Sequence, residues 1–197
     1  MCKQFGNIRI DVEKLGIDLL SMSAHKFYGP KGVGALYVRN GIELERIQDG
    51  GHQERGKRSG TENVAGIVGL AEALKLANSN LEENSKKILQ NRIYFINRLK
   101  EKIKDVVING DLEKRLPGNI NVTFKDKDSL ELLLKLDEYN ICASAGSACS
   151  TGESSPSHVL TAIGLTPEQI FRTLRFSLGK VNTKDEIDYV INVLDKL

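Results

Sequence analysis

The sequence predicts an α/β protein, and three features lead to that fold class. Short apolar runs of strand length alternate with longer segments in which apolar residues recur every three or four positions. A long amphipathic segment near the middle of the chain separates two groups of such elements. Two capping boxes mark the starts of helices in the second group. A chain of 197 residues is long enough to bury a hydrophobic core.

The first group of elements begins with two expected strands and a turn. Residues 15–22 and 32–38 are apolar runs of strand length. The stretch between them is polar and rich in turn residues, so we expect it at the mouth of a sheet. A loop rich in glycine and charge follows at 49–60. Thr61 is predicted to be the N-cap of a helix over residues 62–77.

A long helix is predicted over residues 81–104. One apolar stripe follows its length, formed by Leu89, Ile93, Ile96, Leu99 and Ile103. We expect a domain boundary inside this helix, within residues 82–88, which gives one domain over 1–83 and a second over 84–197.

The second group alternates strands and helices. The expected strands are 106–108, 119–124, 141–143 and 173–178. Residues 130–138 form an expected helix, and 144–157 a loop rich in glycine and serine. Thr166 and Thr183 each begin a capping box, the first with Pro167 at the first helical position. The final helix has one apolar face, formed by Ile187, Val190, Ile191, Leu194 and Leu197.

Composition excludes several classes of protein. The net charge of +2 gives no reason to expect a nucleic-acid or membrane partner. No apolar run has the length of a transmembrane helix. Cys2, Cys142 and Cys149 form neither a disulfide framework nor a zinc motif of usual spacing. We therefore expect a cytoplasmic location, no intrinsic metal, and Cys142 as a small core residue.

Lys26 is the first candidate for chemistry. A lysine that forms a Schiff base must be partly neutral, and a strand end beside His25 offers desolvation and a neighbouring cation. Ser23 and the amides around it could hold a phosphate in the same turn. The alternative is a solvated loop lysine. The glycines of residues 29–34 fail the pattern of a nucleotide-binding loop and are interpreted as structural.

A basic loop precedes the expected helix at Thr61. Arg55, Lys57 and Arg58 lie close before that helix, so an anion site is one interpretation. A solvated basic loop is the other interpretation, and the sequence alone does not separate them.

Cys149 and Arg175 are the remaining candidates. Cys149 lies among small residues that cannot bury a thiol, which suits either a travelling nucleophile or an unremarkable exposed cysteine. Arg175 interrupts the apolar strand at 173–178, where its fork suits a carboxylate. The alternative for Arg175 is a structural ion pair with Asp188 or Glu186.

Four motifs occur in the order in which a known family carries them. Ser23-Ala24-His25-Lys26, with Tyr28-Gly29-Pro30-Lys31-Gly32, resembles the cofactor-lysine segment of the NifS/IscS cysteine desulfurases. Residues 55–61 are similar to their Arg-x-x-Arg-Ser-Gly-Thr stretch. Residues 147–149 and 174–179 resemble the catalytic-cysteine loop and the substrate-arginine strand.

The resemblance implies a fold and a cofactor. The fold would be the C-terminal part of a transferase dependent on pyridoxal 5'-phosphate (PLP), of the aspartate aminotransferase type. Residues 1–83 would be a remnant of the large PLP-binding domain, and 84–197 a complete small α/β domain. Lys26 would carry PLP and act as the base, while Ser23, Ala24 and His25 contact the cofactor. Thr61 would reach the PLP phosphate of the other subunit of a homodimer.

The resemblance also implies the reaction. Arg175 would grip the carboxylate of L-cysteine, and Cys149 would take its sulfur, leaving L-alanine and a persulfide. The sulfur would pass to an iron–sulfur scaffold protein or a tRNA-thiolation partner, with Cys149 as a transient cluster ligand. The family's N-terminal half, with its Asp-x-x-Gln stretch, is not found in this sequence. Two other interpretations therefore stay open: a non-catalytic or sulfur-relay fragment, and a selenocysteine lyase.

Overall fold

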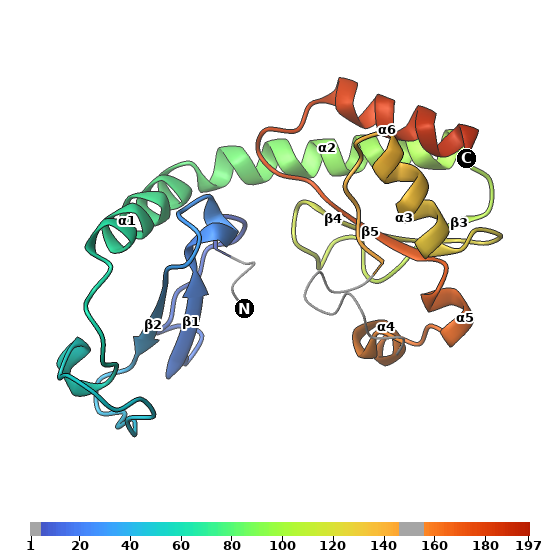
Figure 1. Ribbon diagram of the computed structural model, residues 1–197. Coiled ribbons are helices and arrows are strands. Elements are labelled where there is room, and N and C mark those ends of the chain that lie inside the picture. The colour runs from blue at the N-terminus through green and yellow to red at the C-terminus, as the bar shows by residue number, and fades with distance from the viewer. Residues whose placement is uncertain (1–4, 146–155) are drawn as a thin grey trace. The chain divides into compact units, whose positions relative to one another are not determined.

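The computed structural model describes residues 5–145 and 156–197. The chain divides into two compact units, Met1–Glu83 and Asn84–Leu197. The boundary lies near the start of helix α2 (Leu81–Lys102). Both units combine helices with antiparallel strands (Figure 1).

The first unit is built on a hairpin of two strands. Strand β1 (Leu19–Ser23) pairs antiparallel with β2 (Gly34–Val38), from Leu19 opposite Val38 to Ser23 opposite Gly34. Both strands are shorter than predicted. The apolar run before Leu19 forms a turn instead, because Asp11 accepts hydrogen bonds from two backbone amides and the Ile17 amide donates to the carbonyl of Val12.

A short 3-10 helix and one α-helix complete this unit. The 3-10 helix η2 (Ala24–Phe27) follows β1 directly, and α1 (Val64–Ser79) packs against it. A second 3-10 turn, η3 (Glu54–Gly56), lies in the basic loop. The core of the unit contains Phe5, Leu20, Ala24, Phe27 and Leu70.

The start of α1 differs from the prediction. The helix begins at Val64, and its N-cap is Asn63, whose side chain accepts a hydrogen bond from the Gly66 amide at 3.1 Å. Thr61 lies before the helix as an exposed residue and does not cap it. Asparagine is at least as good an N-cap as threonine, so the nearer residue takes the role.

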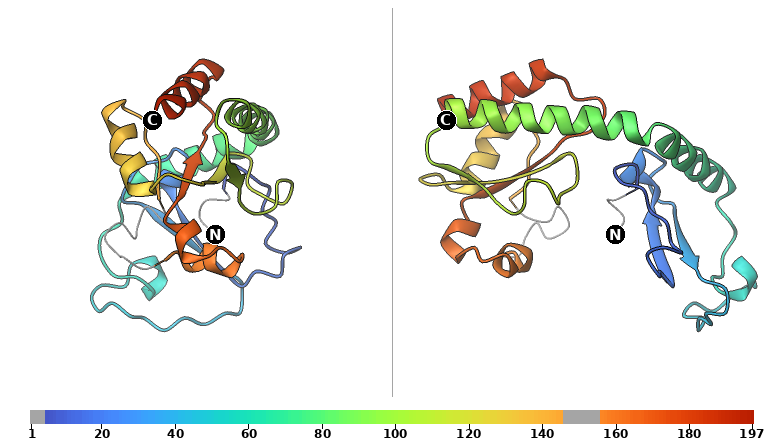
Figure 2. Two further views of the ribbon diagram at one scale, coloured as in Figure 1. Left: turned by 90° about the vertical axis from the view of Figure 1, so that its right-hand side faces the viewer. Right: turned by 180° about the vertical axis from the view of Figure 1, so that it is seen from behind.

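The second unit is a three-stranded antiparallel sheet with helices on one face. The strand order is β3 (Val106–Ile108), β4 (Asn119–Phe124) and β5 (Thr173–Ser177). Helices α2, α3 (Ser129–Glu138) and α6 (Lys184–Lys196) lie on the same face of this sheet (Figures 1 and 2). The short helices α4 (His158–Ala162) and α5 (Pro167–Ile170) lie away from that helix layer.

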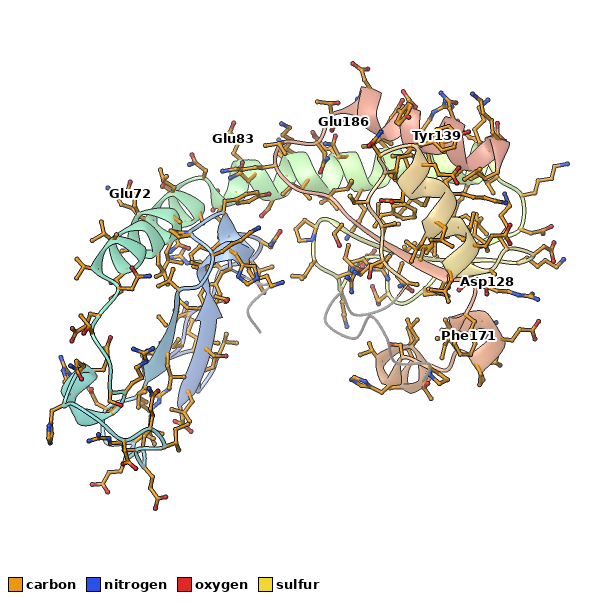
Figure 3. All side chains as sticks on the ribbon, in the orientation of Figure 1. Glu72, Glu83, Asp128, Tyr139, Phe171 and Glu186 are labelled. Carbon is orange, nitrogen blue, oxygen red and sulfur yellow. The ribbon has the colours of Figure 1, made fainter. Side chains whose placement is uncertain are left out.

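Capping fixes the helix starts in this unit. Both predicted capping boxes, at Thr166 and Thr183, are confirmed, with Pro167 at the start of α5. Asp128 caps α3 by accepting hydrogen bonds from the amides of Leu130 and Glu131. Figure 3 shows Asp128 at the start of α3 and Glu186 in the first turn of α6.

The buried face of α2 is not the predicted stripe. Leu89 and Ile93 are exposed, whereas Ile96, Leu99 and Ile103 are buried as expected. The buried face also includes Ile88, Asn91, Arg92 and Phe95. Arg92 lies on the core side because its guanidinium donates to the carbonyls of Leu116 and Leu112, at 3.0 and 2.9 Å. The predicted stripe was therefore wrong in part because Arg92, a charged residue, lies on the buried face of α2.

The predicted strand at 141–143 is wrong. Residue 144 forms only an isolated bridge with Arg175. Cys142 is exposed and is not a core residue. The run follows Asn140, which has a left-handed φ of 57°, and is too short to continue the pairing.

The different burial of two leucines on α3 leads to a prediction about stability. Leu136 on α3 is fully buried, whereas Leu134 on the same helix is 72% exposed. We expect Leu136→Ala to lower the free energy of unfolding by about 2–5 kcal/mol, because it leaves a cavity. Leu134→Ala should change it by roughly 0.5 kcal/mol or less. Urea unfolding followed by circular dichroism measures both variants. Equal effects of the two substitutions would show that α3 does not pack as described.

The described residues contain neither a membrane-spanning helix nor a candidate metal cluster. Within residues 5–145 and 156–197, no helix is both long and apolar enough to cross a membrane. In the same ranges, no group of three or more His, Cys, Asp or Glu side chains is placed to hold a metal ion.

Candidate functional site

The turn that carries Lys26 is held firmly on the first unit. The Ala24 amide donates to the Val33 carbonyl at 3.0 Å, and the Gly29 amide donates to the Ala24 carbonyl at 2.9 Å. Ala24 and Phe27 are buried. A Cβ on Gly29 would lie 2.9 Å from the Cβ of Ala24, so only glycine fits there. The backbone around Lys26 is therefore fixed by packing from both sides.

The polar side chains of this turn remain available. The Ser23 hydroxyl and the Nδ1 atom of His25 form a hydrogen bond of 3.3 Å. Lys26 is partly buried, and it forms no ion pair with any residue the structure describes. The hydroxyl of Ser23 and the imidazole of His25 thus lie together on the turn that also carries Lys26.

The basic loop is organised by a buried serine. Ser59 donates to the carbonyls of Gln48 and Asp49, both at 2.9 Å, and is 2% exposed. The Gly60 amide donates to Oε1 of Gln53 at 3.1 Å. These bonds fold residues 48–60 onto themselves. The sequence analysis did not predict this structural role of Ser59. The one indication in the sequence was a serine within a basic motif.

The cations of this loop face outward. Arg55, Lys57 and Arg58 are exposed, and no carboxylate in the described part of the chain forms an ion pair with them. Thr61 is exposed beside them. Thr61 follows these cations in the sequence, and helix α1 begins two residues later than predicted, at Val64 instead of residue 62.

Arg175 occupies the middle of β5 in the second unit. Its amide donates to the Ser144 carbonyl at 2.7 Å, and its carbonyl accepts from the Ser144 amide at 3.1 Å. The Nε atom of its guanidinium is buried and has no hydrogen-bond partner among the described residues. An arginine in this state is costly unless an anion meets it.

The alternative interpretation of Arg175, a structural ion pair with Asp188 or Glu186, is wrong. Asp188 accepts hydrogen bonds from Tyr94 at 2.7 Å and Arg98 at 2.9 Å, which together hold the pKa of its carboxyl below the ordinary value. Glu186 accepts from the Thr183 amide at 2.9 Å as part of the capping box. Both proposed partners are engaged elsewhere, so the guanidinium of Arg175 has no protein carboxylate in the described ranges.

The remaining predicted site residue, Cys149, lies outside the described residues, as does Cys2. Lys26 belongs to the first unit and Arg175 to the second. Each of these two residues is therefore described within its own unit.

The fold and these motifs place the chain in a known class. Residues 1–190 match the family described as aminotransferase class V, so the chain belongs to that family. Its architecture is that of part of a PLP-dependent transferase of fold type I, as seen in the NifS-like structures that it resembles.

The particular relatives narrow the class. The chain is 50% identical over 194 residues to cysteine desulfurase IscS of Clostridium botulinum, covering 98% of this chain and 49% of that protein. It is 45% identical to cysteine desulfurase IscS of Dictyoglomus turgidum, with 98% and 49% covered. A NifS-like protein of Rickettsia africae superposes with a TM-score of 0.88 at 33% identity, with 98% and 50% covered. The chain spans about half the length of the relatives it matches.

Proposed function

We propose that this chain is part of a PLP-dependent cysteine desulfurase, which converts L-cysteine to L-alanine and leaves the sulfur as a persulfide on Cys149. The observation that carries the proposal is the likeness over 98% of the chain, at up to 50% identity, to proteins named cysteine desulfurase. The buried Nε atom of Arg175 supports it, because this atom has no hydrogen-bond partner among the described residues and an amino-acid substrate brings a carboxylate.

The residues of the Lys26 turn suit the cofactor. PLP has an aldehyde, for which Lys26 supplies a primary amine, and a phosphate, for which Ser23 and His25 supply hydrogen-bond donors. The tight contact of Gly29 with Ala24 keeps these groups on a fixed backbone. When bound, PLP supplies an electron sink for the carbon atoms of the substrate. Thr61 is proposed to contact the phosphate across a homodimer interface.

Arg175, Lys26 and Cys149 each have a separate proposed role in the reaction. Arg175 orients L-cysteine by its carboxylate. Lys26 removes the proton from the α-carbon of the substrate and returns protons as L-alanine forms. The thiolate of Cys149 attacks the sulfur of the substrate, so that a sulfur–sulfur bond forms while the carbon–sulfur bond breaks. The electron pair of the broken bond stays with the carbon, which is protonated to the methyl group of L-alanine.

The persulfide requires an acceptor. We propose an iron–sulfur scaffold protein or a sulfur carrier for tRNA thiolation as the partner, in the cytoplasm. Radioactive sulfur transferred from the loaded protein to a purified scaffold protein would support this assignment. Retention of all label on the desulfurase in the presence of scaffold and iron would argue for a different acceptor.

Arg175→Ala tests the substrate assignment. We expect the KM for L-cysteine to rise by roughly 10- to 200-fold, because that is the loss in binding expected when a hydrogen bond to a charged group is removed. Arg172→Ala is the control, because that guanidinium lies three residues earlier and is already engaged by Glu168 at 3.0 Å. Steady-state release of L-alanine by the intact protein gives both constants. An unchanged KM in the Arg175 variant would contradict the role of Arg175.

A further inference from the structure

The sheet of the second unit has a polar face opposite its core face. Ile120, Val122 and Phe124 of β4 point into the core, so the alternate residues of the strand point the other way. The register places Asn121 opposite Arg175 and Thr123 opposite Thr173 on that face. The sequence analysis did not predict this polar face. The signal was present in β4, where polar and apolar residues alternate with the two-residue period of a strand.

Four side chains on this face form one connected chain of hydrogen bonds. Asn109 is 6% exposed, Thr123 is 7% exposed and Thr173 is 1% exposed. The Thr173 hydroxyl donates to the Gln169 carbonyl at 2.6 Å, and it lies 2.7 Å from the hydroxyl of Thr123. The Asn109 amide nitrogen lies 2.8 Å from Thr123 Oγ1 and 2.8 Å from Asn121 Oδ1.

The Gln169 carbonyl at the end of this series of hydrogen bonds determines which group donates in each of them. The Gln169 carbonyl only accepts, so the single proton of Thr173 points to it. Thr173 must then accept from Thr123, which uses the only proton of Thr123. Thr123 must therefore accept from Asn109, so the amide group of Asn109 that faces it is the nitrogen.

The last link sets the orientation of Asn121. The same nitrogen of Asn109 donates its second proton to Asn121, so the atom of Asn121 that faces Asn109 is the oxygen Oδ1. Strand β4 lies between β3 and β5, and the Asn109 amide continues the β3 side by donating to the Asn121 carbonyl at 2.9 Å. The Nδ2 group of Asn121 therefore points away from Asn109, and the cross-strand neighbour of Asn121 on β5 is Arg175.

Two donors on this face therefore have no acceptor among the described residues. The hydrogen bond of the Asn121 side chain to a described residue uses Oδ1 and leaves Nδ2 as a donor, and Nε of Arg175 is buried without a partner among these residues. A pair of donors on neighbouring strands suits an anion, and a carboxylate has enough lone pairs to accept from both. A neutral amide strengthens such a site without adding charge repulsion to the guanidinium.

We propose that Asn121 is a second binding residue for the substrate carboxylate, and that Asn109, Thr123 and Thr173 are positioning residues that fix its amide as a donor. This inference rests on the proposed function, because it assigns the carboxylate of an amino acid to Arg175. It adds a residue of the second unit whose role is set by the forced direction of the hydrogen bonds.

Binding of L-alanine, the product of the proposed reaction, tests the inference without turnover. In the intact protein labelled with ¹⁵N, we expect the side-chain amide signal of Asn121 to shift on addition of L-alanine. Asn121→Ala should weaken the Kd for L-alanine by about tenfold or more, as expected for a lost hydrogen bond to a charged group. Ethylamine, which has no carboxylate, should bind both forms equally.

Asn119→Ala is the matched control. Asn119 lies on the same face of β4, opposite Ser177, and its removal should leave the Kd for L-alanine unchanged. A wild-type Kd in the Asn121 variant, or no shift of the Asn121 amide with L-alanine, overturns the inference. Failure of the proposed function is a different result, namely no release of L-alanine from L-cysteine by the intact wild-type protein.

Thr123→Val and Thr123→Ser separate positioning from structure. Valine removes the hydroxyl that sets the orientation of Asn109, so the KM for L-cysteine should rise by several-fold with little change in kcat. Serine keeps the hydroxyl and should restore the KM. Equal KM values for the two variants would contradict the positioning role of Thr123.

Discussion

Lys26→Ala is expected to remove both the visible absorbance of bound PLP and the release of L-alanine from L-cysteine. The amine of Lys26 is the only group on its turn that can join the aldehyde of the cofactor, since Ser23 and His25 lack a primary amine. Loss of the attachment site and of the base together should lower kcat by about 10³-fold or more. Absorbance after addition of PLP, and an assay for L-alanine, measure the two effects.

Lys14→Ala is the control for that variant. Lys14 is an exposed lysine of the same unit, and its removal should leave absorbance and turnover at wild-type values. A Lys26 variant that retains the absorbance band and wild-type turnover would contradict the assignment of the cofactor lysine. Loss of the band in both variants would indicate a damaged fold, which circular dichroism would detect.

Cys149→Ser is expected to stop sulfur transfer while leaving PLP binding intact. The thiolate is the proposed nucleophile, and serine at that position cannot form a persulfide. Removal of a nucleophile typically costs several orders of magnitude, so release of sulfide and L-alanine should fall by about 10³-fold or more. Mass spectrometry of the protein after reaction with L-cysteine should show no added sulfur in this variant.

Cys142→Ser provides the matched comparison. Cys142 is an exposed free thiol seven residues earlier in the chain, outside the packed core. Its variant should gain the 32 Da of one sulfur atom, like the wild type, and turn over L-cysteine at the same rate. Undiminished turnover by the Cys149 variant would refute the assigned nucleophile, and loss of the added sulfur only in the Cys142 variant would reassign it.

Helix starts could be predicted because their signals are local. The capping boxes at Thr166 and Thr183 each need only four consecutive residues, and both are present in the structure. The start of α1 was misplaced for the same reason, because Asn63 and Thr61 both have the chemistry of an N-cap. Local rules name the candidates, and packing decides among them.

The buried face of α2 needed information that periodicity does not hold. Arg92 reads as a solvent residue in sequence, yet two carbonyls of a loop far along the chain hold its guanidinium on the core side. Leu89 and Ile93 read as core residues but are exposed. Buried polar groups are accepted where partners exist, and partners of this kind are not visible in a window of sequence.

The candidate site also combines residues with a local sequence signal and a residue whose role depends on contacts between distant segments. A motif of four consecutive residues identified the Lys26 turn, and an arginine within an apolar strand drew attention to Arg175. The role of Asn121 depended on the pairing of β4 with β5 and on a carbonyl of α5, which are contacts between distant segments. The roles of Lys26, Thr61, Cys149 and Arg175 in catalysis stay predictions.

Reduction with borohydride tests the central claim, that Lys26 carries the cofactor, most directly. The intact protein is mixed with PLP, reduced, digested and analysed by mass spectrometry, so that the amine joined to the cofactor is marked permanently. The account predicts one pyridoxyl group, on Lys26. A label on another lysine, with Lys26 unmodified, would contradict it.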